Sequence, residues 1–390
     1  MKLQTVVIVV ACSLLLGGCW DRIEVNDIAI VTAAGIDKAE NKEIELSVQI
    51  FIPRSFSVGS MQGGGVKTVT LVRRARGVDI ADAMSKLQMN LPRRIFWGHC
   101  KVYIYGEELA KAGVSELVDY LARHPQPRNR AFMYVSKGKA ADVLNLKTDL
   151  ERYSGEAVRE LSGLKIGMEI TLVDLINMFM GKSKAAVLPV IAVLPPSDPK
   201  KPESTDPYLF GSAVLKDGKM VGLLTQRVTR GVMWLRNEAA STTVTVKAKN
   251  VKGFVSLNPF RERTKLVPSI QDGKWKMLVV VETEGDLIQN GTHLNLVNPK
   301  WMKQIQMALQ DDIETRLKLT LQQVQHGLKA DIFGFATQFH RKYPKEFARV
   351  KDRWEEVFPK VEVSLKVSAS IRRPGLATVP GGLTESEVKP

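Results

Sequence analysis

Apolar positions in the first half of the chain follow the periods of both strands and helices. A nearly continuous apolar run covers residues 28–36, and apolar residues occupy every second position from Glu43 to Ile50, a pattern typical of strands. The second of these strands is expected to expose its other face. Two apolar segments, 101–105 and 131–135, flank a stretch with helical periodicity from Glu107 to Ala122, which predicts a β-α-β unit.

The second half of the chain shows strand pairs, then helices, then a closing strand. Asp217-Gly218 and Asp272-Gly273 each separate two apolar segments, and these dipeptides favour the tight turn of a β-hairpin. From Lys300 a long helix is predicted, and after Asp331, which fits a helix N-cap, shorter helices follow. Alternation at 361–367 predicts the last strand. The apolar face of the long helix consists of Ile305, Leu309, Ile313, Leu317, Leu321, Val324 and Leu328.

Proline marks the predicted division of the chain. Five prolines lie within 195–207, and proline fixes φ and lacks a backbone donor, so a linker is expected there. It would separate an N-terminal α+β lobe at 19–194 from a C-terminal α+β lobe at 208–373, which may subdivide. Residues 374–390 have the composition of a disordered tail. The predicted fold class is α+β, multi-lobed, with mixed sheets and packed helices.

The first residues have the features of a lipoprotein signal. An apolar run from Val6 to Leu16 follows Lys2 and is shorter than the roughly 20 residues of a spanning helix. Leu16-Gly17-Gly18-Cys19 then fits a cleavage site before a lipid-modified cysteine. We therefore expect residues 1–18 to be a signal peptide and Cys19 to carry S-diacylglycerol and N-acyl groups, which anchor the mature chain to a membrane. An ordinary secretory signal is the alternative.

Composition and charge narrow the possible functions. Of three cysteines, Cys12 lies in the signal and Cys19 is the lipid site, so Cys100 is left as a buried thiol without a disulfide partner. The formal net charge of +15 suits a polyanion. For an exported protein, we expect the bound polyanion to be anionic phospholipid, a wall polymer or an acidic loop of a partner protein rather than nucleic acid. A basic surface that is merely solvated remains the simpler interpretation of the charge.

Enzyme and metal signatures are weak in this sequence. Ser-x-x-Lys occurs at Ser136, Ser162 and Ser197, but the companion motifs of penicillin-binding enzymes are absent. The five histidines are dispersed, without the spacing of metal ligands. We therefore predict no catalytic, cofactor-binding or metal-binding residues and a protein that is not an enzyme.

Several short motifs occur in an order that is characteristic of one family. They are Gly18-Cys19-Trp20-Asp21-Arg22, Val31-Thr32-Ala33-Ala34-Gly35-Ile36-Asp37, Gly98-His99-Cys100-Lys101-Val102, Gly211-Ser212-Ala213-Val214 and Ala330-Asp331-Ile332-Phe333-Gly334-Phe335. With these motifs the chain resembles the Ger(x)C family, the C subunits of nutrient germinant receptors in endospore-forming bacteria. The resemblance covers nearly the whole mature chain.

The resemblance implies a three-lobed α+β lipoprotein on the outer face of the spore inner membrane. It implies two kinds of integral-membrane partner, the A-type and B-type receptor subunits, and a non-catalytic role in triggering spore germination. Only Cys19, as the lipid site, carries over as a functional residue. The main alternative is a membrane-tethered solute-binding lipoprotein, and a surface hydrolase acting on wall polymers is a further one.

Overall fold

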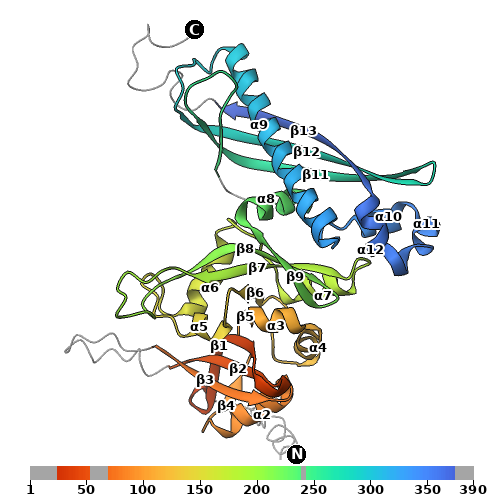
Figure 1. Ribbon diagram of the computed structural model, residues 1–390. Coiled ribbons are helices and arrows are strands. Elements are labelled where there is room, and N and C mark those ends of the chain that lie inside the picture. Colours follow the sequence, from red (N-terminus) through yellow and green to blue (C-terminus); the bar gives the residue numbers. More distant parts are fainter. Residues whose placement is uncertain (1–23, 53–68, 239–242, 374–390) are drawn as a thin grey trace, which may run out of the picture.

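The described residues of the computed structural model, 24–52, 69–238 and 243–373, form two β-sheets with helices packed against them (Figure 1). The predicted signal peptide, Cys19 and the predicted tail at 374–390 lie outside these ranges. Within the described ranges, the first sheet has nine strands and the second has four. The multi-lobed α+β class expected from the sequence is confirmed.

The first sheet has a parallel centre and antiparallel flanks. Its order is β3-β2-β1-β5-β6-β7-β8-β9, with the short β4 paired to the beginning of β1. Neighbouring strands among β1, β5, β6 and β7 run parallel, which confirms the predicted β-α-β unit. The strands are β1 (Ile28–Lys38), β2 (Ile44–Phe51), β3 (Thr70–Gly77), β4 (Arg94–Phe96), β5 (Val102–Gly106), β6 (Phe132–Ser136), β7 (Ala185–Val193), β8 (Pro207–Lys216) and β9 (Lys219–Thr225).

Helices cover both faces of this sheet. One face packs with α5 and α6 around Ile104 and Tyr134, and the other packs with α2, α3, α4 and α7. The half-exposed second strand expected from alternation is therefore wrong: Ser47 and Gln49 are buried, at 0% and 1% exposed. The helices are α2 (Ile80–Met89), α3 (Glu107–Ala112), α4 (Ser115–Arg123), α5 (Ala140–Leu144), α6 (Ser154–Gly163), α7 (Leu172–Met180) and α8 (Gln226–Leu235).

The predicted single helix from Glu107 to Ala122 is two helices in the structure. Gly113 separates α3 from α4 and has a φ of 135°, a backbone conformation that residues other than glycine rarely adopt. Helical spacing of apolar residues continues across this break, so periodicity alone did not reveal it. The break lets Val114 N–H donate to the Gly218 carbonyl oxygen at 2.9 Å, which fixes α4 against the β8–β9 turn.

The proline-rich segment 195–207 lies between two neighbouring strands of the first sheet. It connects β7 to β8, which pair antiparallel from Ala185↔Lys216 to Val193↔Pro207. Strands on both sides of the segment belong to one sheet, because the first sheet continues through β8 and β9. Prolines end a strand in the same way whether the chain next enters a loop or a linker, so composition did not separate the two cases.

The second sheet is built on a long hairpin with a helix across one face. Its order is β10-β11-β12-β13, and β13 returns parallel to β12. The predicted turns are confirmed: Asp217-Gly218 and Asp272-Gly273 both have positive φ angles. The elements are β10 (Val244–Val246), β11 (Val255–Gln271), β12 (Lys274–Asn290), β13 (Glu362–Arg373), α9 (Pro299–Leu321), α10 (Phe335–Lys342), α11 (Pro344–Ala348) and α12 (Trp354–Val357), with a π-helical stretch at Gln322–Leu328 after α9.

Helix α8 joins the two sheets by packing against α9 (Figure 1). Gly231 allows this close approach, since a Cβ atom there would lie 2.0 Å from Thr320 Oγ1. Thr320 Oγ1 donates to the carbonyl oxygens of Arg316 and Val228 at 2.8 and 3.3 Å. The buried core consequently continues from one sheet to the other.

Candidate functional site

A groove of about 700 Å³ lies beside α4. Its apolar floor includes Ile80 from α2, Leu109 from α3 and Leu117 from α4, all buried. Charged groups of both signs line its rim: Lys38, Lys42, Arg123 and Lys219, with Glu43, Asp79, Glu116, Asp119 and Asp217. An apolar floor with a rim of mixed charge suits a small bipolar molecule or an extended peptide segment.

Two rim groups have structural roles in their helices. Asp79 caps α2 by accepting a hydrogen bond from Asp82 N–H at 2.8 Å. Asp119 forms an ion pair with Arg123 at 2.8 Å along α4, and this pair is largely exposed. The structure describes this groove where sequence reasoning found no site, because its lining comes from α2, α4 and the β8–β9 turn.

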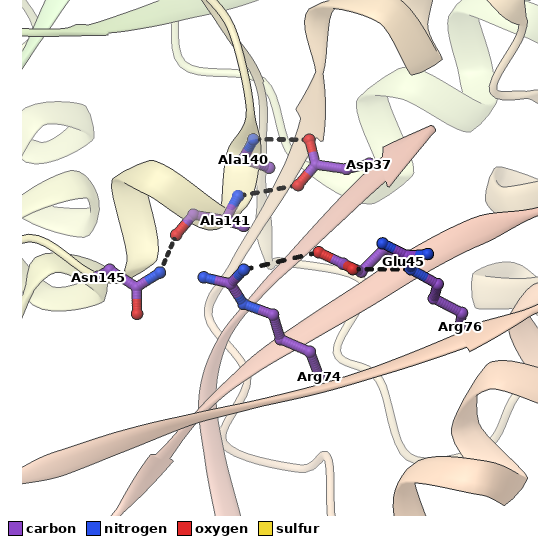
Figure 2. A network of polar contacts seen from close by, with 7 residues as sticks. All are labelled: Asp37, Glu45, Arg74, Arg76, Ala140, Ala141 and Asn145. Atoms are coloured by element: carbon purple, nitrogen blue, oxygen red, sulfur yellow. Dashed lines mark hydrogen bonds and ion pairs between the residues drawn. The ribbon is translucent and has the colours of Figure 1, made fainter. Parts of the chain in front are cut away.

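A buried carboxylate at the end of β1 holds α5 in place (Figure 2). Asp37 is 4% exposed, and its Oδ1 and Oδ2 accept hydrogen bonds from Ala140 N–H and Ala141 N–H at 2.8 and 2.9 Å. Burial raises the pKa of Asp37, while the two N–H donors act in the opposite direction. Gly106 leaves room for this arrangement, since a Cβ atom there would lie 2.0 Å from Oδ1.

Beyond Asp37, the network continues at the surface of the same sheet. Figure 2 shows Glu45 on β2 facing Arg74 and Arg76 on β3. Its Oε1 lies 3.7 Å from Arg74 Nη1, and its Oε2 lies 3.2 Å from Arg76 Nε. Asp37 was singled out in the sequence only as part of a family motif. A signal for its role exists nonetheless: it is an acidic residue ending an apolar run that reads as a buried strand.

A second buried carboxylate organises the aromatic end of the second lobe. Asp331 is 3% exposed and accepts hydrogen bonds from the backbone N–H groups of Gly334, Phe335 and Ala336 and from Trp354 Nε1. Its carboxylate therefore binds the backbone at the start of α10, but the N-cap position predicted for Asp331 belongs to Gly334, and the helix begins at Phe335. Trp354 belongs to a cluster of aromatic rings whose neighbouring centroids are 5.3–6.4 Å apart, formed with Phe335, Phe339, Phe347 and Phe358.

Cys100 and two of the three serines of the Ser-x-x-Lys matches are buried, whereas Ser197 is exposed. Cys100 is buried as predicted, and burial raises the pKa of its thiol to about 12. Ser136 Oγ donates to the Gly138 carbonyl oxygen at 2.9 Å, and Ser162 Oγ bonds Tyr134 OH. No group of three His, Cys, Asp or Glu side chains in the described part of the chain is placed to hold a metal ion.

The predicted lipid site, Cys19, lies outside the described residues, so it remains an expectation from the sequence. Among the described helices, none combines the length and the apolar character needed to cross a bilayer.

Fold and site together define a two-sheet α+β protein whose buried carboxylates clamp its own backbone. Two family models match it: Spore germination protein N-terminal domain over residues 21–193 and Spore germination B3/GerAC like, C-terminal over residues 210–375. The chain belongs to this family of spore germination proteins, the Ger(x)C family.

Relatives match this chain almost from end to end. Spore germination protein KC of Bacillus subtilis (strain 168) is 28% identical, and the match covers 97% of both chains. Putative spore germination protein YfkR of the same organism is 30% identical over 93% of this chain and 94% of its own. The crystal structure of the GerBC protein has a similar fold, with a TM-score of 0.57 and 18% identity, covering 87% of this chain and 96% of GerBC.

Proposed function

We propose that this chain is the lipid-anchored, non-catalytic subunit of a spore nutrient germinant receptor. The observation that carries the proposal is that both family models match in order and that spore germination protein KC matches over 97% of each chain. A role in spore germination shared over the full length supports a shared role for the whole chain rather than for one borrowed domain.

In this proposal, Cys19 carries the lipid and holds the protein on the outer face of the spore inner membrane. The chain assembles there with integral-membrane subunits of the A and B types and triggers germination through them. A tether raises the effective concentration of the chain beside membrane partners, so contacts that are weak in solution suffice for assembly.

Spores carrying Cys19→Ala test this proposal, with Cys12→Ala as the matched control because it removes another cysteine of the N-terminal region. We expect Cys19→Ala spores to lose this protein from the inner membrane and to lose the response to some nutrients, while Cys12→Ala spores behave as wild type. Unchanged germination and unchanged membrane levels in the Cys19→Ala spores would refute the proposal.

The groove beside α4 favours a second candidate, a tethered solute-binding lipoprotein. Its apolar floor and its rim of both charges suit a bipolar solute. Calorimetric titration of the purified protein with nutrients that trigger the spores distinguishes the two. Saturable binding that Leu117→Arg abolishes would favour solute binding by this chain, and its absence would leave nutrient recognition to a partner subunit.

A further inference from the structure

Basic side chains gather where the parallel strands of the first sheet begin. Arg94 begins β4 and Arg93 precedes it; Lys101 immediately precedes β5, and Arg128 and Arg130 precede β6. We call these five residues the basic edge. Four are exposed and Arg93 is partly exposed. Because parallel strands begin at the same side of a sheet, residues spread over 38 positions of sequence come to one side of the molecule.

Backbone contacts connect the segments that carry the basic edge. Ile28 at the start of β1 pairs with Arg94. Lys101 lies between β1 and β6, since its N–H donates to the Thr32 carbonyl oxygen at 3.1 Å and its own carbonyl oxygen accepts from Phe132 N–H at 2.8 Å. The loop before β6 is joined to the end of β4, because Trp97 N–H donates to Gln126 Oε1 at 3.1 Å.

The basic edge is not neutralised by neighbouring carboxylates. Among the described residues, none of its five side chains forms an ion pair, whereas Arg74 and Arg76 on the same sheet share Glu45. Two acidic residues, Glu24 and Asp27, lie on the segment that enters β1. Glu156 lines a small hollow with Lys101, and Asp174 follows Val173, whose N–H donates to the Asn129 carbonyl oxygen, but neither carboxylate pairs with the basic edge.

The chain enters the fold at this same side, which points to the surface that the edge faces. Glu24 follows Cys19 by five positions, and a chain spans at most about 3.5 Å per residue, so Glu24 lies within roughly 17 Å of Cys19 whatever path the chain takes. The second sheet is at the opposite end of the molecule from β4 and α2 (Figure 1). A tether of this length therefore brings the basic edge, and not the second sheet, close to the membrane.

From these observations we infer that the basic edge is a membrane-docking surface that binds the head groups of anionic phospholipids. The inference rests on the proposed lipid anchor at Cys19 and adds an orientation to it: the first sheet lies against the bilayer and the second sheet projects away. Arginine and lysine near a negatively charged bilayer strengthen binding by about fivefold per charge, an effect that salt screens.

The test uses the chain that follows the proposed cleavage site, with Cys19→Ala so that it carries no lipid. Its co-sedimentation is measured with phosphatidylcholine vesicles, with and without phosphatidylglycerol, at low and physiological ionic strength. The variant Arg94→Gln/Arg128→Gln/Arg130→Gln removes three charges of the basic edge. The matched control Arg263→Gln/Lys265→Gln/Lys366→Gln removes three exposed charges of the second sheet and gives the same net charge.

We expect wild type and the control to bind vesicles containing phosphatidylglycerol, with binding that decreases as salt increases. The edge variant should bind roughly 100-fold more weakly, following from about fivefold for each of three charges. Equal weakening of both triple variants would overturn the inference, because net charge alone would then explain binding. Absence of binding by wild type at low salt would also overturn it and would favour an acidic protein surface as the partner.

Because this chain carries no lipid, the vesicle result does not depend on Cys19. Failure here with loss of germination in Cys19→Ala spores would refute the orientation and leave the receptor proposal in place. Circular dichroism of the two triple variants checks that both are folded.

Discussion

Replacement of Asp331 by asparagine tests how the aromatic end of the second lobe is held together. Each carboxylate oxygen accepts two N–H groups in the fold. Oδ1 bonds Gly334 and Phe335, both at 3.0 Å, and Oδ2 bonds Ala336 at 2.7 Å and Trp354 Nε1 at 3.0 Å. An amide has one acceptor oxygen, so in either orientation its NH₂ group faces two donors that have lost their acceptor.

The magnitude follows from those two lost hydrogen bonds. A hydrogen bond to a charged group contributes about 1.5–3 kcal/mol, and losses within one network are not additive. We therefore expect Asp331→Asn to lower the free energy of unfolding by about 3 kcal/mol. For a folded unit of 150–250 residues this corresponds to a decrease in Tm of roughly 6–12 °C. Asp331→Ala removes all four bonds and should lower the stability further.

Urea unfolding and thermal unfolding followed by tryptophan fluorescence measure this change, since Trp354 and Trp275 lie in the same aromatic cluster, 5.7 Å apart. The control is Asp352→Asn, at an exposed carboxylate without a polar partner among the described residues, where the change should stay within about 0.5 kcal/mol. A change as small as this in Asp331→Asn would refute the reasoning. It would indicate that burial, which raises the pKa of Asp331, keeps the carboxyl neutral in the fold.

Three further predictions concern two hairpin turns and two buried side chains of the first sheet. Gly218→Ala and Gly273→Ala change equivalent turns with φ near 75°, but only at Gly218 would the new Cβ lie 1.8 Å from Ser115 Oγ. In thermal unfolding, the free energy of unfolding should therefore fall by about 1 kcal/mol for Gly273→Ala and by at least ~1 kcal/mol more for Gly218→Ala. Equal losses would contradict the predicted clash. Cys100 keeps its proton in the fold between pH 9 and about 12 while the unfolded thiol ionises, so the free energy of unfolding should fall as pH rises through that window, and rapid alkylation of native protein at pH 8 would contradict this. Gln49→Leu removes the hydrogen bonds of Gln49 to the Leu144 carbonyl oxygen, Ser154 Oγ and Gly155 N–H, and should lower the free energy of unfolding in urea by about 3 kcal/mol. The control is Ser47→Ala, because the Ser47 hydroxyl has no hydrogen-bond partner among the described residues and its loss should be tolerated.

Much of the local structure was determined by sequence patterns that depend only on neighbouring residues. The Asp217-Gly218 and Asp272-Gly273 turns were correct because a tight hairpin needs positive φ angles at two successive positions, which these residues adopt most easily. The α9 helix was correct because its apolar spacing continues over six turns. The helix from Glu107 was wrong because Gly113 changes direction without interrupting the apolar spacing.

Only the tertiary structure decided how these elements combine. Pairing between β7 and β8 made residues 195–206 a connection between two strands of one sheet. Burial of Gln49 required α5 and α6 to cover a face that alternation had left open. The groove beside α4 and the Asp37 clamp join residues about 100 positions apart. The basic edge likewise depends on the order and direction of parallel strands. Sequence sets the local conformation, whereas strand pairing brings distant residues together, and no single segment records that pairing.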